Sequence, residues 1–203
     1  MSTTEKRHTD PERALSRRRQ VLDAAALCFS RSGFHGASMA EISKAAGMSA
    51  GHIYNYFDGK DAIIAAFVEE EVERVALLLR DLEQKDDPLQ AIIDDSDGTV
   101  DEHMEPGFWT LKLEIFAEAS RNPKVAAVMV HADLRMRTQL RAIVKAGRER
   151  HGLDADDATV DGRMETTIAL FQGLALRALH HPELDKAALK RAYRVGLGAL
   201  LLS

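Results

Sequence analysis

Apolar residues recur three and four positions apart along nearly the whole chain, and polar residues fill the positions between them. This period is that of an amphipathic α-helix, and the strict alternation of a half-buried β-strand is missing from the sequence. Gly, Pro and Asn-Pro breaks divide the pattern into segments. The sequence therefore predicts an all-α fold of about nine helices, near residues 11–32, 38–46, 49–57, 60–83, 88–103, 106–121, 123–150, 158–181 and 184–202.

Two of these helices, 38–46 and 49–57, are short and nearly adjacent in the chain. Ser38 is a good N-cap for the first of them, and Glu41, three residues later, completes a capping box. Gly47 ends this helix, and Ser49 caps the next one. A connection of about three residues that contains a Gly is typical of a helix-turn-helix.

The second short helix has an apolar side and a small polar side. Helical spacing places Ile53 and Phe57 together, with Gly51, His52 and Asn55 on the opposite side. Such a face fits the major groove of DNA, because Asn can pair with adenine and small residues let the backbone come close. Tyrosine hydroxyls and lysines beside it can reach phosphates.

Charge is distributed unevenly along the chain. Residues 1–60 hold nine Lys and Arg against six Asp and Glu, a net charge of +3, which leaves −8 for residues 61–203 of a chain whose total is −5. A basic N-terminal part followed by an acidic remainder is expected when only the N-terminal part binds a polyanion. The basic run at 17–19 would then contact phosphates or enter the minor groove.

Residues 21–63, VLDAAALCFSRSGFHGASMAEISKAAGMSAGHIYNYFDGKDAI, resemble the N-terminal domain of the tetracycline-repressor (TetR) family of bacterial transcription regulators. The likeness is carried by the aromatic and Gly positions from Phe29 to Phe34, by Ile42 and Ala46-Gly47-Met48-Ser49, and by Ile53-Tyr54, Tyr56-Phe57 and Lys60. The resemblance implies a helix-turn-helix DNA-binding domain with a basic N-terminal arm at 1–60, and a helical ligand-binding and dimerisation domain at 61–203. The family's usual role implies repression that a small molecule relieves.

The helix-turn-helix and the resemblance together give a set of predicted DNA contacts. These residues are Arg17, Arg18, Ser38, Met39, Ser49, Ala50, Gly51, His52, Tyr54, Asn55, Tyr56 and Lys60. The expected partner is a palindromic operator in double-stranded DNA, bound by a homodimer.

The segment 103–120 has the richest apolar surface of the body. Phe108, Leu111 and Ile115 form one helical stripe, and Trp109 with its neighbours widens it to about 200°, more than one packing partner needs. A sensor pocket would use this surface, and so would an ordinary packed core. The predicted ligand-binding residues are Met104, Phe108, Trp109, Lys112, Leu113, Glu114, Phe116, Met129 and Phe171.

The last two predicted helices, 158–181 and 184–202, carry the expected dimer interface. Gly173, Gly196 and Gly198 each destabilise a helix by roughly 1 kcal/mol relative to Ala, which is tolerable where two backbones must approach closely. The terminal LGALLLS would expose apolar surface in a monomer. We therefore expect these helices to pair with their symmetry mates in a four-helix interface.

Several classes of protein are excluded by what the sequence lacks. It has no metal-ligand spacing, Gly-rich phosphate loop or nucleophile motif, so we expect neither an enzyme nor a cofactor. One cysteine, Cys28, excludes a disulfide framework, and no apolar run is long enough for a membrane span or a signal peptide.

We expect a protein of the bacterial cytosol that is associated with the nucleoid when it is bound to its operator. The alternatives are a ligand-independent regulator or activator of the same fold, or a helical scaffold that does not bind DNA.

Overall fold

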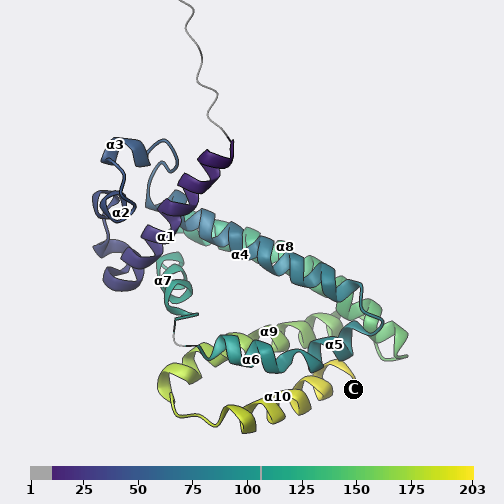
Figure 1. Ribbon diagram of the computed structural model, residues 1–203. Coiled ribbons are helices and arrows are strands. Elements are labelled where there is room, and N and C mark those ends of the chain that lie inside the picture. The colour runs from purple at the N-terminus through teal and green to yellow at the C-terminus, as the bar shows by residue number, and fades with distance from the viewer. Residues whose placement is uncertain (1–10, 106) are drawn as a thin grey trace, which may run out of the picture. The chain divides into compact units, whose positions relative to one another are not determined.

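The computed structural model describes residues 11–105 and 107–203, and within them it contains ten helices and no strand (Figure 1). The prediction of an all-α fold is confirmed. The first ten residues, part of the predicted DNA-binding domain and its arm, and Pro106, the predicted start of a helix, lie outside the described residues. The helices are α1 (Pro11–Gly36), α2 (Met39–Ala45), α3 (Ala50–Ile53), α4 (Lys60–Glu83), α5 (Pro88–Asp94), α6 (Ser96–His103), α7 (Thr110–Ala119), α8 (Pro123–Arg150), α9 (Asp157–His180) and α10 (Lys186–Leu201).

One predicted helix, 88–103, is in fact two, and the prediction of a single helix there was wrong. Asp95 is at once the C-cap of α5 and the N-cap of α6. The next side chain, Ser96, turns back to donate its hydroxyl hydrogen to Ile93 O at 2.6 Å. Asp and Ser side chains compete in this way for backbone hydrogen bonds and are poor residues for a helix interior.

The second helix of the predicted helix-turn-helix is also shorter than expected. Regular α-helix ends at Ile53, and the backbone N–H groups of Asn55 and Tyr56 donate to carbonyls three residues back. Such bonds tighten the last turns of a helix. The segment nevertheless stays coiled as far as Phe57, whose N–H donates to Ile53 O at 3.2 Å.

Residue contacts divide the chain into two compact units, and α4, α7 and α8 each contribute residues to both. Unit 1 comprises residues 1–67 and 114–126, and unit 2 comprises 68–113 and 127–203. This division describes packing. The prediction that 1–60 binds DNA and 61–203 binds a ligand concerns function and stays a prediction.

The core of unit 1 is aromatic at its centre. The Phe29 ring lies 5.5 Å from the Phe34 ring and 6.4 Å from the Phe67 ring, measured between centroids. The apolar sides of the two short helices, represented by Ile42 and Ile53, are fully buried in this unit. The helix-turn-helix is therefore held from behind by apolar packing.

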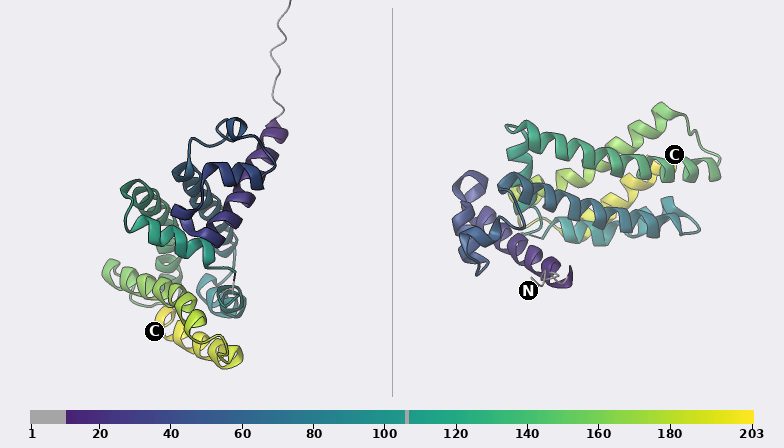
Figure 2. Two further views of the ribbon diagram at one scale, coloured as in Figure 1. Left: turned by 90° about the vertical axis from the view of Figure 1, so that its left-hand side faces the viewer. Right: turned by 90° about the horizontal axis from the view of Figure 1, so that it is seen from above.

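In unit 2, α5, α6, α9 and α10 pack against one another, and α6, α9 and α10 run side by side (Figures 1 and 2). Helix α8 adds Val144 to this core, where it packs with Leu89 of α5 and Val160 of α9. The approach of α8 to α5 is close, because a Cβ placed on Gly147 would lie 2.5 Å from Leu89 Cγ.

A charged side chain, Arg148, lies inside unit 2 with 1% of its surface exposed. Its guanidinium donates to three main-chain oxygens, Asp154 O at 2.6 Å, Leu201 O at 2.9 Å and Ser203 O at 3.0 Å. These bonds tie the end of α8 to the end of α10.

Within the described ranges, no helix combines the length and the apolar character that crossing a membrane requires.

Candidate DNA interface and effector site

The two short helices of unit 1 are capped as the sequence predicts. Ser38 Oγ accepts from Glu41 N at 3.2 Å, and Glu41 Oε2 accepts from Ser38 N at 2.8 Å, which is a complete capping box. The Ser38 hydroxyl also donates to Glu41 Oε2, at 2.9 Å, and the bonds that the backbone N–H and the hydroxyl of Ser38 donate to this carboxylate lower the pKa of Glu41. Ser49 Oγ accepts from His52 N at 3.3 Å at the start of α3. Both predicted caps are confirmed.

The face of the second short helix is divided as its periodicity predicts. Ile53 and Phe57 are buried, whereas Gly51, His52 and Asn55 are exposed. Tyr54 keeps 52% of its surface accessible, although it is a large aromatic residue. The outer face is thus polar, narrow and free of large aliphatic side chains.

His52 lies at the centre of this face. Its two ring nitrogens are each 3.4 Å from a neighbouring polar atom, Nδ1 from Asn55 Nδ2 and Nε2 from Tyr56 Oη. The His52 and Tyr56 rings are also in edge contact, with centroids 5.4 Å apart. The imidazole therefore restrains two of the side chains that we expect to contact DNA.

Three further predicted DNA contacts, all of them basic, have intramolecular partners. Arg17 donates to Gln20 Oε1 at 2.8 Å, and the guanidinium of Arg18 lies over the Phe57 ring at 4.8 Å. Lys60 Nζ donates to Phe34 O at 2.5 Å and to Ala37 O at 2.8 Å. Lys60 therefore fastens the turn between α1 and α2. Of the remaining predicted contacts, Ser38, Ser49 and Ala50 are exposed and Met39 is half-buried.

Carboxylates from α7 meet the end of α1 within unit 1. Gly33 has a φ of 69° and kinks α1, and the next backbone N–H, that of Phe34, donates to Glu114 Oε2 at 3.2 Å. Glu118 is buried, accepts from Asn122 Nδ2 at 3.0 Å, and has its Oε2 3.0 Å from His35 Nε2. Glu114, a predicted ligand residue, is thus placed against α1.

In unit 2, four ring side chains meet in what we call the aromatic cluster, His103, Phe108, Trp109 and Phe171. The His103 ring lies at its centre, with centroid distances of 5.0 Å to Phe108, 5.2 Å to Trp109 and 5.8 Å to Phe171. Lys112 Nζ lies 3.8 Å from the Phe108 centroid. Four of the predicted ligand residues, Phe108, Trp109, Lys112 and Phe171, are therefore brought together.

Two of the charges beside the aromatic cluster are balanced by carboxylates. Glu71 accepts from Lys112 Nζ at 2.8 Å and from Arg74 Nη2 at 2.8 Å, and Arg74 also lies 3.4 Å from Glu102. Burial acts to raise the pKa of Glu71, but the hydrogen bonds and charges of Arg74 and Lys112 lower it to about 2. Glu71 therefore stays ionised at any physiological pH.

Met104 lies next to the aromatic cluster, because it forms a core with Val100 and Leu174 against which Phe171 packs. The other predicted ligand residues lie elsewhere. Leu113 and Met129 are half-buried on α7 and α8, and the exposed Phe116 lies on the part of α7 that belongs to unit 1. Sequence reasoning missed His103, Glu71 and Arg74 as members of the site. His103 could have been chosen from the sequence, because it directly precedes Met104. Glu71 and Arg74, both on α4, join the site only through the tertiary fold.

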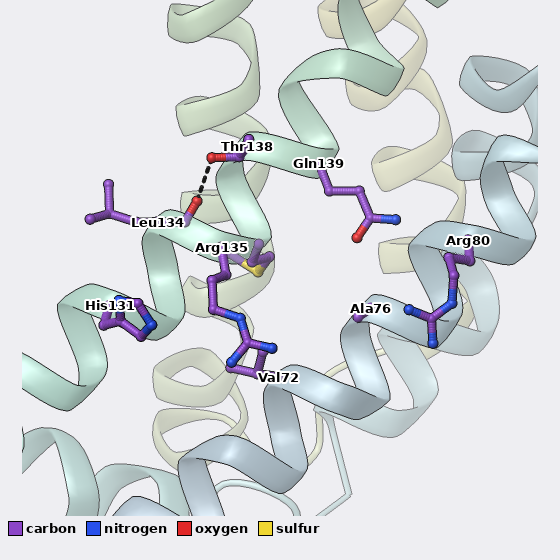
Figure 3. Close-up of a pocket in the computed structure, with 9 residues that line it drawn as sticks. Val72, Ala76, Arg80, His131, Leu134, Arg135, Thr138 and Gln139 are labelled. Atoms are coloured by element: carbon purple, nitrogen blue, oxygen red, sulfur yellow. Dashed lines mark hydrogen bonds between the residues drawn. The ribbon is translucent and has the colours of Figure 1, made fainter.

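A separate groove of about 590 Å³ lies between α4 and α8 in unit 2 (Figure 3). Figure 3 shows Arg135 and Gln139 of α8 projecting toward α4. Arg135 is already paired, because Nη1 donates to Glu69 Oε1 at 2.7 Å. The lining residues are Val72, Ala76, Arg80, His131, Leu134, Arg135, Met136, Thr138 and Gln139.

Outside residues 1–10 and 106, no three His, Cys, Asp or Glu side chains lie close enough together to bind a metal ion.

Comparison with known proteins gives matches over both parts of the chain. Residues 21–67 match the bacterial regulatory proteins of the tetR family, and residues 86–202 match the C-terminal domain of BetI-type transcriptional repressors. Over 188 residues the chain is 28% identical to the HTH-type transcriptional regulator UidR of Escherichia coli K12, with 91% of this chain and 90% of that protein covered.

Two further relatives extend the comparison. The structure of Salmonella enterica GusR superposes with a TM-score of 0.77 at 27% identity, covering 98% of this chain and 100% of that one. The HTH-type transcriptional repressor Rv1474c of Mycobacterium tuberculosis is 43% identical over 61 residues, which are 30% of this chain and 33% of that protein. Both curated relatives are transcriptional regulators by name.

Proposed function

The chain belongs to the tetR family of bacterial regulatory proteins and is a DNA-binding transcriptional regulator, and from that premise we propose that it is a repressor with a small-molecule effector. It binds a palindromic operator as a homodimer and leaves it when the effector binds. The repressor role is supported by the BetI-type repressor match and by the relative Rv1474c.

The observation that carries the proposal is the exposed face of the second short helix. Its apolar residues are buried, its caps are complete, and Tyr54 and Asn55 stand outward beside His52. A narrow polar face of this kind can enter the major groove, where Asn reads adenine through two hydrogen bonds. Arg17, Arg18 and Lys60 would contact phosphates, which positions the helix without reading sequence.

We place the effector in the aromatic cluster and not in the groove between α4 and α8. Trp109 is 9% exposed, and its indole Nε1–H has no acceptor within the part of the chain that the structure describes. A buried donor without an acceptor is costly, so a ligand that supplied one would gain free energy there. The groove is exposed to solvent, and its Arg135 already has a carboxylate partner.

Helices α9 and α10 are the proposed dimer interface. Leu179 is 62% exposed and Val195 is 74% exposed, and a Cβ on Gly173, Gly196 or Gly198 would meet nothing within 4 Å. These glycines are therefore not explained by packing within one chain. We further propose a cytosolic location and no catalytic activity, since the relatives are regulators and not enzymes.

Fluorescence anisotropy tests the DNA interface, using duplexes selected from a random pool and unrelated duplexes over a range of salt. Asn55→Ala should weaken binding to the selected sequence by about 1–3 kcal/mol and relax its specificity. Tyr54→Ala should weaken binding to all sequences alike, and Lys60→Ala should also lower the salt slope by about one. Lys85→Ala, an exposed change in unit 2, is the control and should bind as the wild type does.

Two outcomes would contradict this assignment. If the wild-type protein selects no sequence from the pool, the scaffold alternative gains support. If it selects one and the Asn55 and Tyr54 variants bind it unchanged, the recognition helix is wrongly assigned.

A further inference from the structure

His103 offers a hydrogen-bond acceptor inside the aromatic cluster. Its Nδ1 lies 2.8 Å from Thr99 O, and a carbonyl oxygen only accepts, so Nδ1 carries the proton. In the neutral ring the other nitrogen, Nε2, is then an acceptor. Burial, helped by the charge of Lys112, lowers the pKa of His103 and keeps the ring neutral at neutral pH. The hydrogen bond that the structure gives to His103 within residues 11–105 and 107–203 uses Nδ1, so Nε2 remains available as an acceptor.

Trp109 offers the complementary donor. Its Nε1–H is buried and has no protein acceptor in the same ranges, and an indole N–H cannot itself accept. The His103 and Trp109 ring centroids are 5.2 Å apart. One oxygen atom that forms hydrogen bonds of about 2.8–2.9 Å to two groups reaches nitrogen atoms up to about 5 Å apart. The contact between the two rings places Nε1 and Nε2 in the same cluster.

The surroundings of these two groups are apolar and electrically balanced. Phe108 and Phe171 present ring surfaces to His103, and Lys112 and Arg74 are matched by Glu71 and Glu102. A ligand with a full negative charge would therefore find no unpaired cation here. An uncharged group that both accepts and donates one hydrogen bond fits, and a hydroxyl is such a group.

We propose that the aromatic cluster binds an uncharged, ring-bearing alcohol or phenol whose hydroxyl accepts from Trp109 Nε1 and donates to His103 Nε2. This rests on the proposed function, in that the same cluster is the effector site. The ligand ring stacks against Phe108 and Phe171, and the hydroxyl fixes its orientation. His103 is thereby a specificity-determining residue, because an ether or a hydrocarbon of the same shape would leave Nε2 without a partner.

The test uses the full-length protein without DNA, labelled with nitrogen-15. Trp109 is the only tryptophan, so the indole region shows a single Nε1–H resonance. Phenol and cyclohexanol are titrated beside their methyl ethers, which keep the ring and the acceptor but lose the donor, and beside benzoate. The alcohols should move the indole proton downfield and bind about fivefold more tightly than the ethers, since one hydrogen bond contributes about 1 kcal/mol.

His103→Phe should abolish the preference for alcohols, and His131→Phe, a histidine in the groove, should keep it. Equal affinities of alcohol and ether for the wild-type protein, an indole resonance that none of the probes moves, or a preference retained in His103→Phe would overturn the proposal. Tighter binding of benzoate than of phenol would also overturn it. If His103→Phe does not fold, the wild-type comparison decides alone. None of these results alters the test of operator binding, so the two proposals fail separately.

Discussion

At the scale of single residues, Arg148 shows how a buried charge can stabilise a protein interior through hydrogen bonds to the main chain. Its three hydrogen bonds all go to main-chain oxygens, two of them at the end of α10. The last carbonyls of a helix have no acceptor role within the helix and need donors from elsewhere. Arg148 supplies these donors in a rigid planar group, which a lysine would not reproduce.

We expect Arg148→Met to lower the free energy of unfolding by about 3 kcal/mol, because it fills a similar volume but leaves buried carbonyls unpaired. Urea denaturation at one protein concentration would measure the change. Arg150→Met is the matched control, since Arg150 is exposed and its hydrogen bond to Asp86 O is long, at 3.2 Å. It should change stability by less than about 0.5 kcal/mol. Equal effects of the two variants would show that the buried contacts of Arg148 are not important.

At the scale of helices, α8 packs closely on α5 in unit 2. Leu89 is fully buried, and its side chain occupies the space that a Cβ on Gly147 would need. Gly98, inside α6, is the opposite case, because a Cβ there would meet nothing within 4 Å. Two glycines inside helices thus have different reasons for their presence.

The same substitution at these two positions should have opposite effects. Gly147→Ala should lower the free energy of unfolding by about 1 kcal/mol, since overpacking typically costs about 1–3 kcal/mol and exceeds the gain in helix propensity. Gly98→Ala should raise it by up to about 1 kcal/mol. Thermal or urea unfolding of both variants is the measurement. A stabilised Gly147→Ala protein would mean that Leu89 can move aside at little cost.

The sequence was sufficient for the helices and for the helix-turn-helix, because these depend on local periodicity and on caps such as Ser38, Glu41 and Ser49. It failed after Asp95, where the Ser96 hydroxyl bonds back to Ile93 O and one helix ends as the next begins. Residues 103–109 could be chosen as a candidate site from their apolar character alone. That Glu71 and Arg74 join them depends on how α4 packs, which no local pattern encodes.

At the scale of the whole molecule, the proposed assembly should be visible in solution. Leu179→Glu or Val195→Glu would bury a carboxylate in the proposed α9 and α10 interface, where a charge without a partner is strongly unfavourable. We expect either change to give a monomer at micromolar concentration, while the wild type sediments as a dimer. Leu27→Glu is the control, because Leu27 is also exposed, at 72%, but belongs to unit 1. A wild-type monomer, or dimers of all three variants, would contradict the interface.

The contacts between α7 and the kinked end of α1 bear on how this regulator can be recombined with others. Unit 1 is discontinuous, since Glu114 accepts from Phe34 N and Glu118 lies against His35 although all of the helix-turn-helix precedes residue 60. A chimera that took only the first 67 residues would leave the backbone N–H of Phe34 without its acceptor and remove the buried Ile115 and Val125. A chimera that joins the helix-turn-helix of this protein to another ligand-binding domain must therefore also contain residues 114–126, so two segments of the chain have to be transferred and not one.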